Sequence, residues 1–350
     1  MAERLPNYHM PSSTTPPPPP HPGRKRRSIG FFGILAILVA CAIVFGIGMS
    51  VTKSSRGAGG AFSEGGVDEY PDLQSVWSYG DGDTDVVRVA IRGPIMRSEG
   101  GFFGSGYDPV ESVLRQIRLA SSDPEVKALI LEIDSPGGGI TSSDLIYNEL
   151  QKFKAHDPER RIVAIFGDVA ASGGYYVAVA ADYIVAHPTT ITGSIGVLIS
   201  TINVKELASR HGVKDVTIKS GANKDMLNPF GDLSEQQWEI LQGMISEMHG
   251  RFVALVAEGR NLPREAVEKV ADGRILTVTQ ALDSGLVDEV GYWDNAVDAV
   301  ARLLDVPSVK IFRYQEAFSL TSLLMSVRNT SFSLDTLLHS RPRMMYLWQL

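Results

Sequence analysis

R-I-V-A-I-F-G-D-V-A-A-S-G-G-Y-Y, residues 161–176, runs from an apolar segment into a serine that is flanked by the smallest side chains. The segment Ile162–Phe166 is uniformly apolar, as expected for a strand of a parallel sheet that is buried on both faces. Ser172 follows at the point where that strand gives way to another element. Small neighbours leave room either for a backbone turn or for a ligand that approaches the hydroxyl. The stretch therefore points to a fold class and to a candidate site at once.

Strands and helices are predicted in alternation on both sides of this stretch. Apolar runs indicate strands, and apolar residues spaced three and four apart indicate helices. Strands are expected at 86–91, 126–133 and 162–166, and helices at 108–120, 141–155 and 234–258. Such alternation is typical of an α/β fold whose sheet is largely parallel.

The composition is that of a globular protein. Of the 350 residues, 44% are hydrophobic and 21% are charged, and the single cysteine, Cys41, excludes an intramolecular disulfide. Residues 1–27 hold five basic residues and one acidic residue, which leaves 28 basic and 39 acidic residues in the rest of the chain. A body this acidic is a poor partner for nucleic acid, because nucleic-acid binding depends on neutralising phosphates.

The N-terminal region predicts a membrane anchor. Ile29–Met49 are 21 residues without a charge, which is long enough to cross a bilayer. Because the basic cluster Arg24–Arg27 lies on one side only, the positive-inside rule places the N-terminus in the cytoplasm and the rest of the chain outside it. A cleaved secretory signal is the alternative, although the apolar run is long for one and no A-x-A cleavage site follows it.

Composition divides the chain into five expected segments. They are a proline-rich, basic and disordered cytoplasmic tail at 1–28, a transmembrane anchor at 29–51, a linker at 52–83, a folded domain at 84–305 and a C-terminal extension at 306–350. The linker assignment depends on a high content of glycine, serine and aspartate. The folded domain begins with the strand-like run at 86–91.

Three glycine-rich turns follow predicted strands. They are D-S-P-G-G-G (Asp134–Gly139), A-S-G-G-Y (Ala171–Tyr175) and T-G-S-I-G (Thr192–Gly196). In open α/β sheets, sites gather at the carboxyl ends of strands, and glycine lets backbone amides point at a ligand. Each turn alone is more simply an ordinary tight turn. Three of them in one domain, one with a serine, favour a site with an oxyanion hole.

A nucleophilic Ser172 would need a base, and the residues alone leave its identity open. The histidines of the body are His156, His187, His211, His249 and His339; none stands out in sequence, although distance along the chain does not exclude a triad. The polar loop Ile218–Phe230 offers Lys219 and Lys224 instead. A lysine base must be neutral, and a shift of its pKa from about 10.4 to about 7 costs about 4 kcal/mol. A solvated surface charge is the simpler interpretation of either lysine.

Four motifs in this order carry a family resemblance. They are A-A-S-G-G-Y-Y, T-G-S-I-G-V, K-S-G-A-N-K-D and A-D-G-R-I-L-T-V-T-Q-A-L-D-S-G-L-V-D-E-V-G. Together they resemble the signal peptide peptidase A family in its short, single-domain bacterial form. The resemblance extends from about Val86 to Ala301, with an anchor in the expected place, and P-R-M-M-Y-L near the C-terminus is also similar.

The resemblance implies a serine peptidase domain with a Ser/Lys dyad on a ClpP/crotonase-like fold. The family's nucleophile matches Ser172, and its general base matches Lys224 and not Lys219. Its oxyanion hole matches the backbone amides of Gly138 and Gly173. Ser194 matches a hydroxyl that would orient the lysine amine. The family also assembles as a ring with sites lined by neighbouring subunits, so Ser172 and Lys224 could meet within one chain or across two.

The implied function is that of an endopeptidase anchored in the bacterial cell membrane, with its catalytic domain extracytoplasmic, that degrades remnant signal peptides and other apolar peptides. A broader quality-control protease of extracytoplasmic proteins would use the same chemistry. A crotonase-like acyl-CoA enzyme and a non-catalytic scaffold are alternatives from other classes. The sequence contains no metal-ligand spacing and no phosphate-binding loop, so we expect no cofactor.

The C-terminal decapeptide R-P-R-M-M-Y-L-W-Q-L (Arg341–Leu350) is apolar apart from two arginines. A packed or frayed terminus is the simpler interpretation. The alternative hypothesis is that this end resembles a substrate and enters a peptide groove, either its own or that of a neighbouring subunit.

Overall fold

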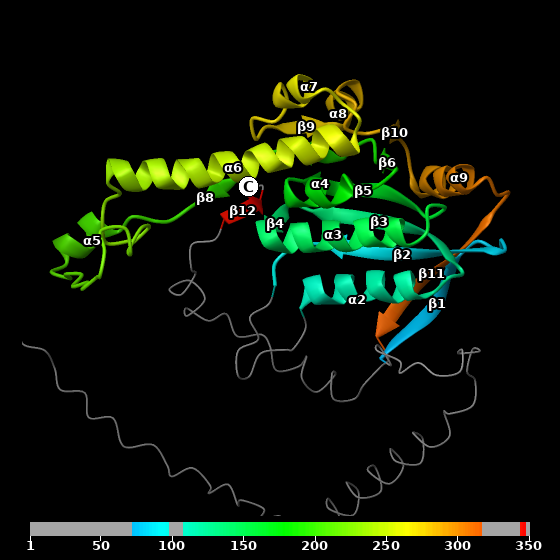
Figure 1. Cartoon of the computed structure of the whole chain (residues 1–350), viewed down its shortest axis with the longest axis horizontal. Helices are drawn as coiled ribbons and strands as arrows, with labels where there is room; N and C mark the ends of the chain where they lie inside the picture. Colours follow the sequence, from blue (N-terminus) through cyan, green and yellow to red (C-terminus); the bar gives the residue numbers. More distant parts are fainter. Residues whose placement is uncertain (1–71, 98–107, 317–343, 348–350) are drawn as a thin grey trace, which may run out of the picture. The chain divides into compact units, whose positions relative to one another are not determined.

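The computed structural model describes residues 72–97, 108–316 and 344–347. Nine of the strands in these residues form the main sheet. They are β1 (Leu73–Tyr79), β2 (Thr84–Arg92), β3 (Val126–Ser135), β5 (Arg161–Ala171), β6 (Tyr183–Ala186), β7 (Ile191–Gly193), β9 (Ile275–Thr277), β10 (Glu289–Val290) and β11 (Val309–Glu316). Their order is β1-β11-β2-β3-β5-β6-β10, with β7 paired to β5 and β9 paired to β7 (Figure 1). All pairs are parallel except β1–β11 and β7–β9. The predicted α/β fold with a largely parallel sheet is confirmed.

A second sheet of three short strands lies beside the glycine-rich turn that follows β3. It consists of β4 (Gly137–Gly139), β8 (Leu198–Ile199) and β12 (Met344–Leu347). The strand β12, from the C-terminal end of the chain, runs antiparallel between the other two. Three segments that are far apart in sequence therefore meet at this place.

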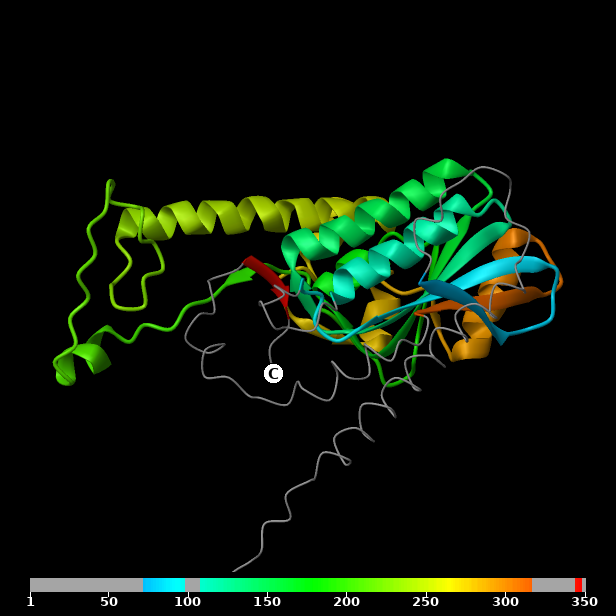
Figure 2. The ribbon, with the colours of Figure 1, turned by 90° about the horizontal axis from the view of Figure 1, so that it is seen from below.

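The described residues form eight helices, and several of them cover the two faces of the main sheet. They are α2 (Pro109–Ser122), α3 (Ile140–His156), α4 (Gly173–Ala178), α5 (Lys205–Arg210), α6 (Glu235–Gly259), α7 (Arg264–Glu268), α8 (Val278–Asp283) and α9 (Trp293–Leu304). The helices α2 and α3 lie side by side on one face, and α9 lies on the other (Figure 2). The three helices that were expected at 108–120, 141–155 and 234–258 correspond to α2, α3 and α6.

The nearly continuous apolar run of β3 contributes side chains to the hydrophobic cores on both faces of the sheet. Successive strand residues point to opposite faces of a sheet, so each face takes alternate side chains. Leu129, Leu131 and Ile133 belong to the core that contains α2, α3 and α4, whereas Ala128 and Ile130 belong to the core under α9. These side chains are buried, whereas Glu132, the polar residue between Leu131 and Ile133, is partly exposed and paired with Arg88.

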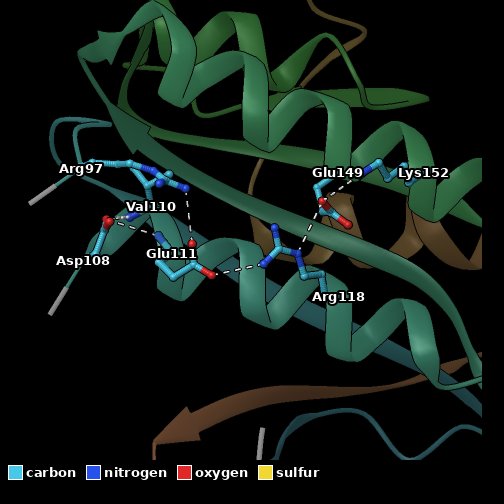
Figure 3. A network of polar contacts seen from close by, with 7 residues as sticks. All are labelled: Arg97, Asp108, Val110, Glu111, Arg118, Glu149 and Lys152. Carbon is cyan, nitrogen blue, oxygen red and sulfur yellow. Dashed lines mark hydrogen bonds and ion pairs between the residues drawn. The ribbon is translucent and has the colours of Figure 1, made fainter. Parts of the chain in front are cut away.

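Polar contacts connect α2 to its neighbours (Figure 3). The side chain of Asp108 caps α2 and accepts hydrogen bonds from the amides of Val110 and Glu111 at 2.9 and 3.3 Å. Arg118 then contacts Glu111 at 3.2 Å and Glu149 of α3 at 3.6 Å. Partly exposed ion pairs of this kind each contribute less than about 1 kcal/mol, so they align the two helices more than they stabilise them.

The sheet takes one strand from each flank of the predicted folded domain. β1 lies within the expected linker at 52–83, and β11 lies within the expected extension at 306–350. Composition does not reveal them, because their place in the sheet depends on pairing between distant segments: in the described part of the chain, β1 pairs with β11, which in turn pairs with β2. The segment boundaries expected from composition otherwise stay predictions.

Membrane insertion is not addressed by the described part of the chain. None of the helices described is long and apolar enough to span a membrane. The predicted tail at 1–28 and the predicted anchor at 29–51 lie outside the described residues.

Candidate active site

Ser172 lies in a strained backbone turn between β5 and α4. Its φ and ψ angles are 54° and −116°, a combination that residues other than glycine rarely adopt and that costs about 1–3 kcal/mol. Its N–H donates a 2.8 Å hydrogen bond to the carbonyl of Gly193, and its own carbonyl accepts one of 2.8 Å from the amide of Tyr176. The residue is 1% exposed. Such strain is typical of functional sites, where the surrounding structure enforces it.

The glycine at 174 allows this turn to pack closely. A Cβ atom at Gly174 would lie 2.8 Å from the carbonyl oxygen of Ser135, at the end of β3. Ala170 and Ala171 are fully buried where β5 passes between β3 and β7. The small residues around Ser172 are therefore required, at least in part, by the close approach of neighbouring backbones.

Two tyrosines hold the helix that Ser172 begins. The Tyr175 hydroxyl is fully buried and donates a 2.8 Å hydrogen bond to the carbonyl of Leu286. Burial raises the pKa of Tyr175, so the hydroxyl keeps its proton. The Tyr176 hydroxyl donates to Asp144 of α3 at 2.6 Å, and Arg251 of α6 contacts the same carboxylate at 2.7 Å. These bonds fix α4, and with it Ser172, against three other segments.

Ser194 is a second serine with a positive φ angle, 51°, and it directly follows β7. Its N–H donates a 2.7 Å hydrogen bond to the carbonyl of Arg274. Ser172 and Ser194 line one cavity of about 360 Å³. The other residues that line it are Gly196, Val197, Leu198, Gln242, Ile245, Ser246, His249, Ala271, Asp272 and Gly273. The structure thus brings together the two serines that the sequence suggested.

Three polar residues of α6 line this cavity; the sequence named only His249, as one of several candidate bases, and missed the other two. The three are Gln242, Ser246 and His249, which follow a spacing of four and three residues and so lie on one face of the helix. His249 Nε2 lies 2.7 Å from the carbonyl of Ala271, so this nitrogen carries the proton and donates. A polar stripe at helical spacing within an otherwise amphipathic helix was the available signal.

Lys224 does not lie in the cavity of its own chain. It is exposed, and it belongs to the segment that joins α5 to α6, which the two views place near the beginning of α6 and away from the main sheet (Figures 1 and 2). Among the described residues, its amine has no hydrogen-bond or ion-pair partner. Lys219 differs, because its amine contacts Asp225 at 2.6 Å and lowers the pKa of that carboxyl. The two lysines of the loop are therefore distinguished by their partners.

Gly138 lies in β4, against the backbone of Ile95. A Cβ atom at this position would lie 2.2 Å from the Ile95 carbonyl oxygen, so only glycine fits without a backbone shift. Gly173 is the first residue of α4, and α4 packs against both β4 and β12. Gly138 and Gly173 thus belong to elements in contact. Whether their amides act on a ligand stays a prediction.

The C-terminal strand β12 pairs with β4 on one side and with β8 on the other. Tyr346 is aligned with Gly138 and Met345 with Gly139, while Met344 is aligned with Ile199 on the other side. Leu198 of β8 also lines the cavity of Ser172. An extended segment that adds a strand to a sheet edge is a common mode of peptide recognition. This arrangement agrees with the hypothesis that the C-terminal end can enter a peptide groove.

No metal centre competes with this interpretation of the site. In residues 72–97, 108–316 and 344–347, no group of three or more His, Cys, Asp and Glu side chains could hold a metal ion. The cavity offers hydroxyl, imidazole and side-chain amide groups and the carboxylate of Asp272. The expectation that no cofactor is needed stays a prediction.

Comparison with known proteins places the chain in a family. The profile of peptidase family S49 matches residues 154–307. A protein of Enterococcus faecium described as signal peptide peptidase SppA is 38% identical over 66% of this chain and 67% of its own length. The chloroplastic serine protease SPPA of Arabidopsis thaliana is 32% identical over 66% of this chain and 34% of its own length. The chain belongs to peptidase family S49 and is a serine peptidase.

A solved structure of a ClpP1 mutant from Listeria monocytogenes is similar at 20% sequence identity, over 60% of this chain and 93% of that one, with a TM-score of 0.39. A TM-score this low does not establish a shared fold, so the ClpP/crotonase-like topology stays a prediction. Membership of a peptidase family disfavours the alternative of an acyl-CoA enzyme.

The strain at Ser172 predicts that catalysis and stability oppose each other at this residue. Ser172→Gly should raise the free energy of unfolding by about 1 kcal/mol relative to Ser172→Ala, because glycine adopts a positive φ without a steric cost. Both variants should lack peptidase activity. Urea unfolding followed by circular dichroism measures the difference. Ala170→Gly is the matched control: with no positive φ to relieve in β5, it should lower stability. A Ser172→Gly variant less stable than Ser172→Ala would contradict the prediction.

Proposed function

We propose that the protein is a membrane-anchored serine endopeptidase that degrades remnant signal peptides after their release from preproteins. The observation that carries the proposal is the strained, buried Ser172, which lines a cavity together with Leu198 of β8, the strand that pairs with the extended strand β12. A relative's description as a signal peptide peptidase supports the substrate class. The uncharged run at 29–51 supports an anchor with the N-terminus in the cytoplasm and the peptidase domain, 84–305, outside it.

In the proposed mechanism, Ser172 is the nucleophile and Lys224 is the general base. The neutral amine takes the hydroxyl proton as the Ser172 oxygen attacks the peptide carbonyl. The amides of Gly138 and Gly173 donate hydrogen bonds to the oxyanion that forms. The lysine then gives its proton to the leaving amine, and water, activated in the same way, releases the acyl group. Ser194 would hold the amine in place from the same cavity.

The position of Lys224 favours a dyad shared between two chains. Lys224 does not line the cavity of its own chain, so a lysine must enter from elsewhere. The segment around it exposes apolar side chains that a monomer would leave in water, namely Ile202, Leu207, Val213, Val216 and Ile218. Exposed apolar groups at such density are typical of a surface that contacts another chain. We infer a homo-oligomeric ring in which each cavity receives Lys224 from a neighbour.

The cavity and groove also support an apolar peptide as the substrate. Val197, Leu198 and Ile245 contribute apolar surface beside Ser172. A strand that pairs with β4 places its backbone next to Gly138, where a scissile carbonyl could reach the proposed oxyanion hole. A broader quality-control protease would use the same chemistry, and trimming of intact, misfolded extracytoplasmic proteins by the purified enzyme would indicate that wider role.

Subunit mixing tests the shared dyad. Ser172→Ala and Lys224→Ala should each lower kcat/KM for an apolar fluorogenic peptide by at least about a thousandfold. When the two inactive variants exchange subunits at equal amounts, about one quarter of the sites in a head-to-tail ring combine both native residues, so about one quarter of the activity should return. Lys219→Ala is the control and should remain active. Near-native activity of Lys224→Ala would contradict the Ser/Lys mechanism and direct attention to His249.

Removal of the C-terminal strand tests the peptide groove. A chain that ends at Ser340 should show a lower KM for the same peptide, because a tethered occupant competes at an effective concentration of about 1 mM. A chain that ends at Leu347 keeps β12 and should behave like the full-length protein. Steady-state kinetics measures both. An unchanged KM after truncation at Ser340 would mean that β12 does not compete with substrate.

A further inference from the structure

The motif A-D-G-R (Ala271–Arg274) contributes to the family resemblance, but the mechanism above gives it no role. Asp272 lines the cavity that contains Ser172 and Ser194. Both of its carboxylate oxygens are engaged by Arg274: Nε lies 2.7 Å from one oxygen and Nη2 lies 2.5 Å from the other. The backbone amide of Arg274 donates a third hydrogen bond, of 3.1 Å, to the first oxygen. This is the bidentate geometry in which arginine binds a carboxylate most specifically.

The same segment also holds Ser194. The Arg274 carbonyl accepts the 2.7 Å hydrogen bond from the Ser194 amide, and the next residue, Ile275, is paired with Gly193 through β7 and β9. The Asp272–Arg274 pair is therefore connected by backbone bonds to the hydroxyl that would orient the lysine. Because these bonds use the backbone of Arg274, a change of its side chain leaves them available.

A carboxylate at this place has an electrostatic consequence. The bonds from Arg274 lower the pKa of Asp272 to about 2, so the carboxylate is charged throughout the working range of the enzyme. A bare negative charge near an amine stabilises the protonated ammonium form, which cannot act as a base. A guanidinium held against the carboxylate cancels most of that field.

Few other charges face the cavity. Among the described residues that line it, Asp272 is the only acid and His249, from α6, is the only other ionisable side chain. On the loop that carries Lys224, Lys219 and Asp225 neutralise each other. The balance of charge that an entering lysine meets is thus set by Asp272, Arg274 and His249.

We propose that Arg274 is a positioning residue for catalysis: by pairing with Asp272, it prevents the carboxylate of the Ser172 cavity from holding the catalytic lysine in its protonated form. The proposal rests on the proposed function, since it requires that Lys224 of some chain enters this cavity. It also gives the paired residues opposite effects. Loss of Arg274 alone exposes a negative charge to the lysine, and loss of Asp272 alone exposes a positive one.

The test is the pH dependence of kcat/KM for the full-length enzyme with an apolar fluorogenic peptide. Arg274→Gln should move the acidic limb of the profile upward by about one pH unit, which lowers the rate about tenfold on the limb and spares it at high pH. Asp272→Asn should move the limb downward. The double variant should return it toward the native position, since neither charge remains. Arg274→Lys, which keeps the positive charge, should move the limb less than Arg274→Gln.

The controls separate this inference from the proposed function. Repeating the series in a His249→Gln background removes the imidazole of the cavity from the comparison. A purely structural role would lower activity equally at every pH, so limbs that stay in place in both single variants would overturn the inference. If Arg274→Gln does not fold, as judged by circular dichroism, the downward shift of Asp272→Asn still decides. If Lys224→Ala is active, the proposed function itself fails, whatever these profiles show.

Discussion

The hydrogen bond from the Ser172 amide to the Gly193 carbonyl determines the geometry of the site. It joins the end of β5 to the end of β7 at the point where the chain turns through a strained conformation. On one side of this bond, Tyr175 and Tyr176 anchor α4 to the body of the protein. On the other side, β7 leads into Ser194 at the wall of the same cavity. Two serines from separate glycine-rich turns therefore line one cavity, because the parallel pairing of β5 with β7, which this hydrogen bond continues, aligns their strands.

The sequence was sufficient to predict the elements that are dominated by local pattern. The sequence pattern predicts β3 and β5 from their apolar runs and α2, α3 and α6 from their helical spacing. The serine at the end of a buried strand is equally visible in the sequence. The flanking strands β1 and β11 could not be predicted in the same way, since their neighbours in the sheet are distant in sequence. The same limit applies to the cavity: His249 and Asp272 reach it from elements that only the folded chain brings to Ser172.

The separation of Lys224 from Ser172 fits an enzyme in which a single chain lacks a complete catalytic site and two chains together form one. A neutral lysine costs about 4 kcal/mol near pH 7, a cost that is lowered by desolvation. Entry into a cavity of a neighbouring chain would supply it, provided that the nearby carboxylate is neutralised, as Arg274 does for Asp272. Under the proposed function, association would therefore both complete the site and activate the base. A single chain would keep its nucleophile buried and without a base.

The central claim is that Ser172 is the nucleophile and that the lysine base activates it. The most direct measurement is to treat the full-length protein with a fluorophosphonate probe and to locate the adduct by mass spectrometry of its peptides. The account predicts one adduct, on Ser172, with no labelling of Ser172→Ala and much slower labelling of Lys224→Ala. An adduct on another residue, or labelling that persists in Ser172→Ala, would contradict it.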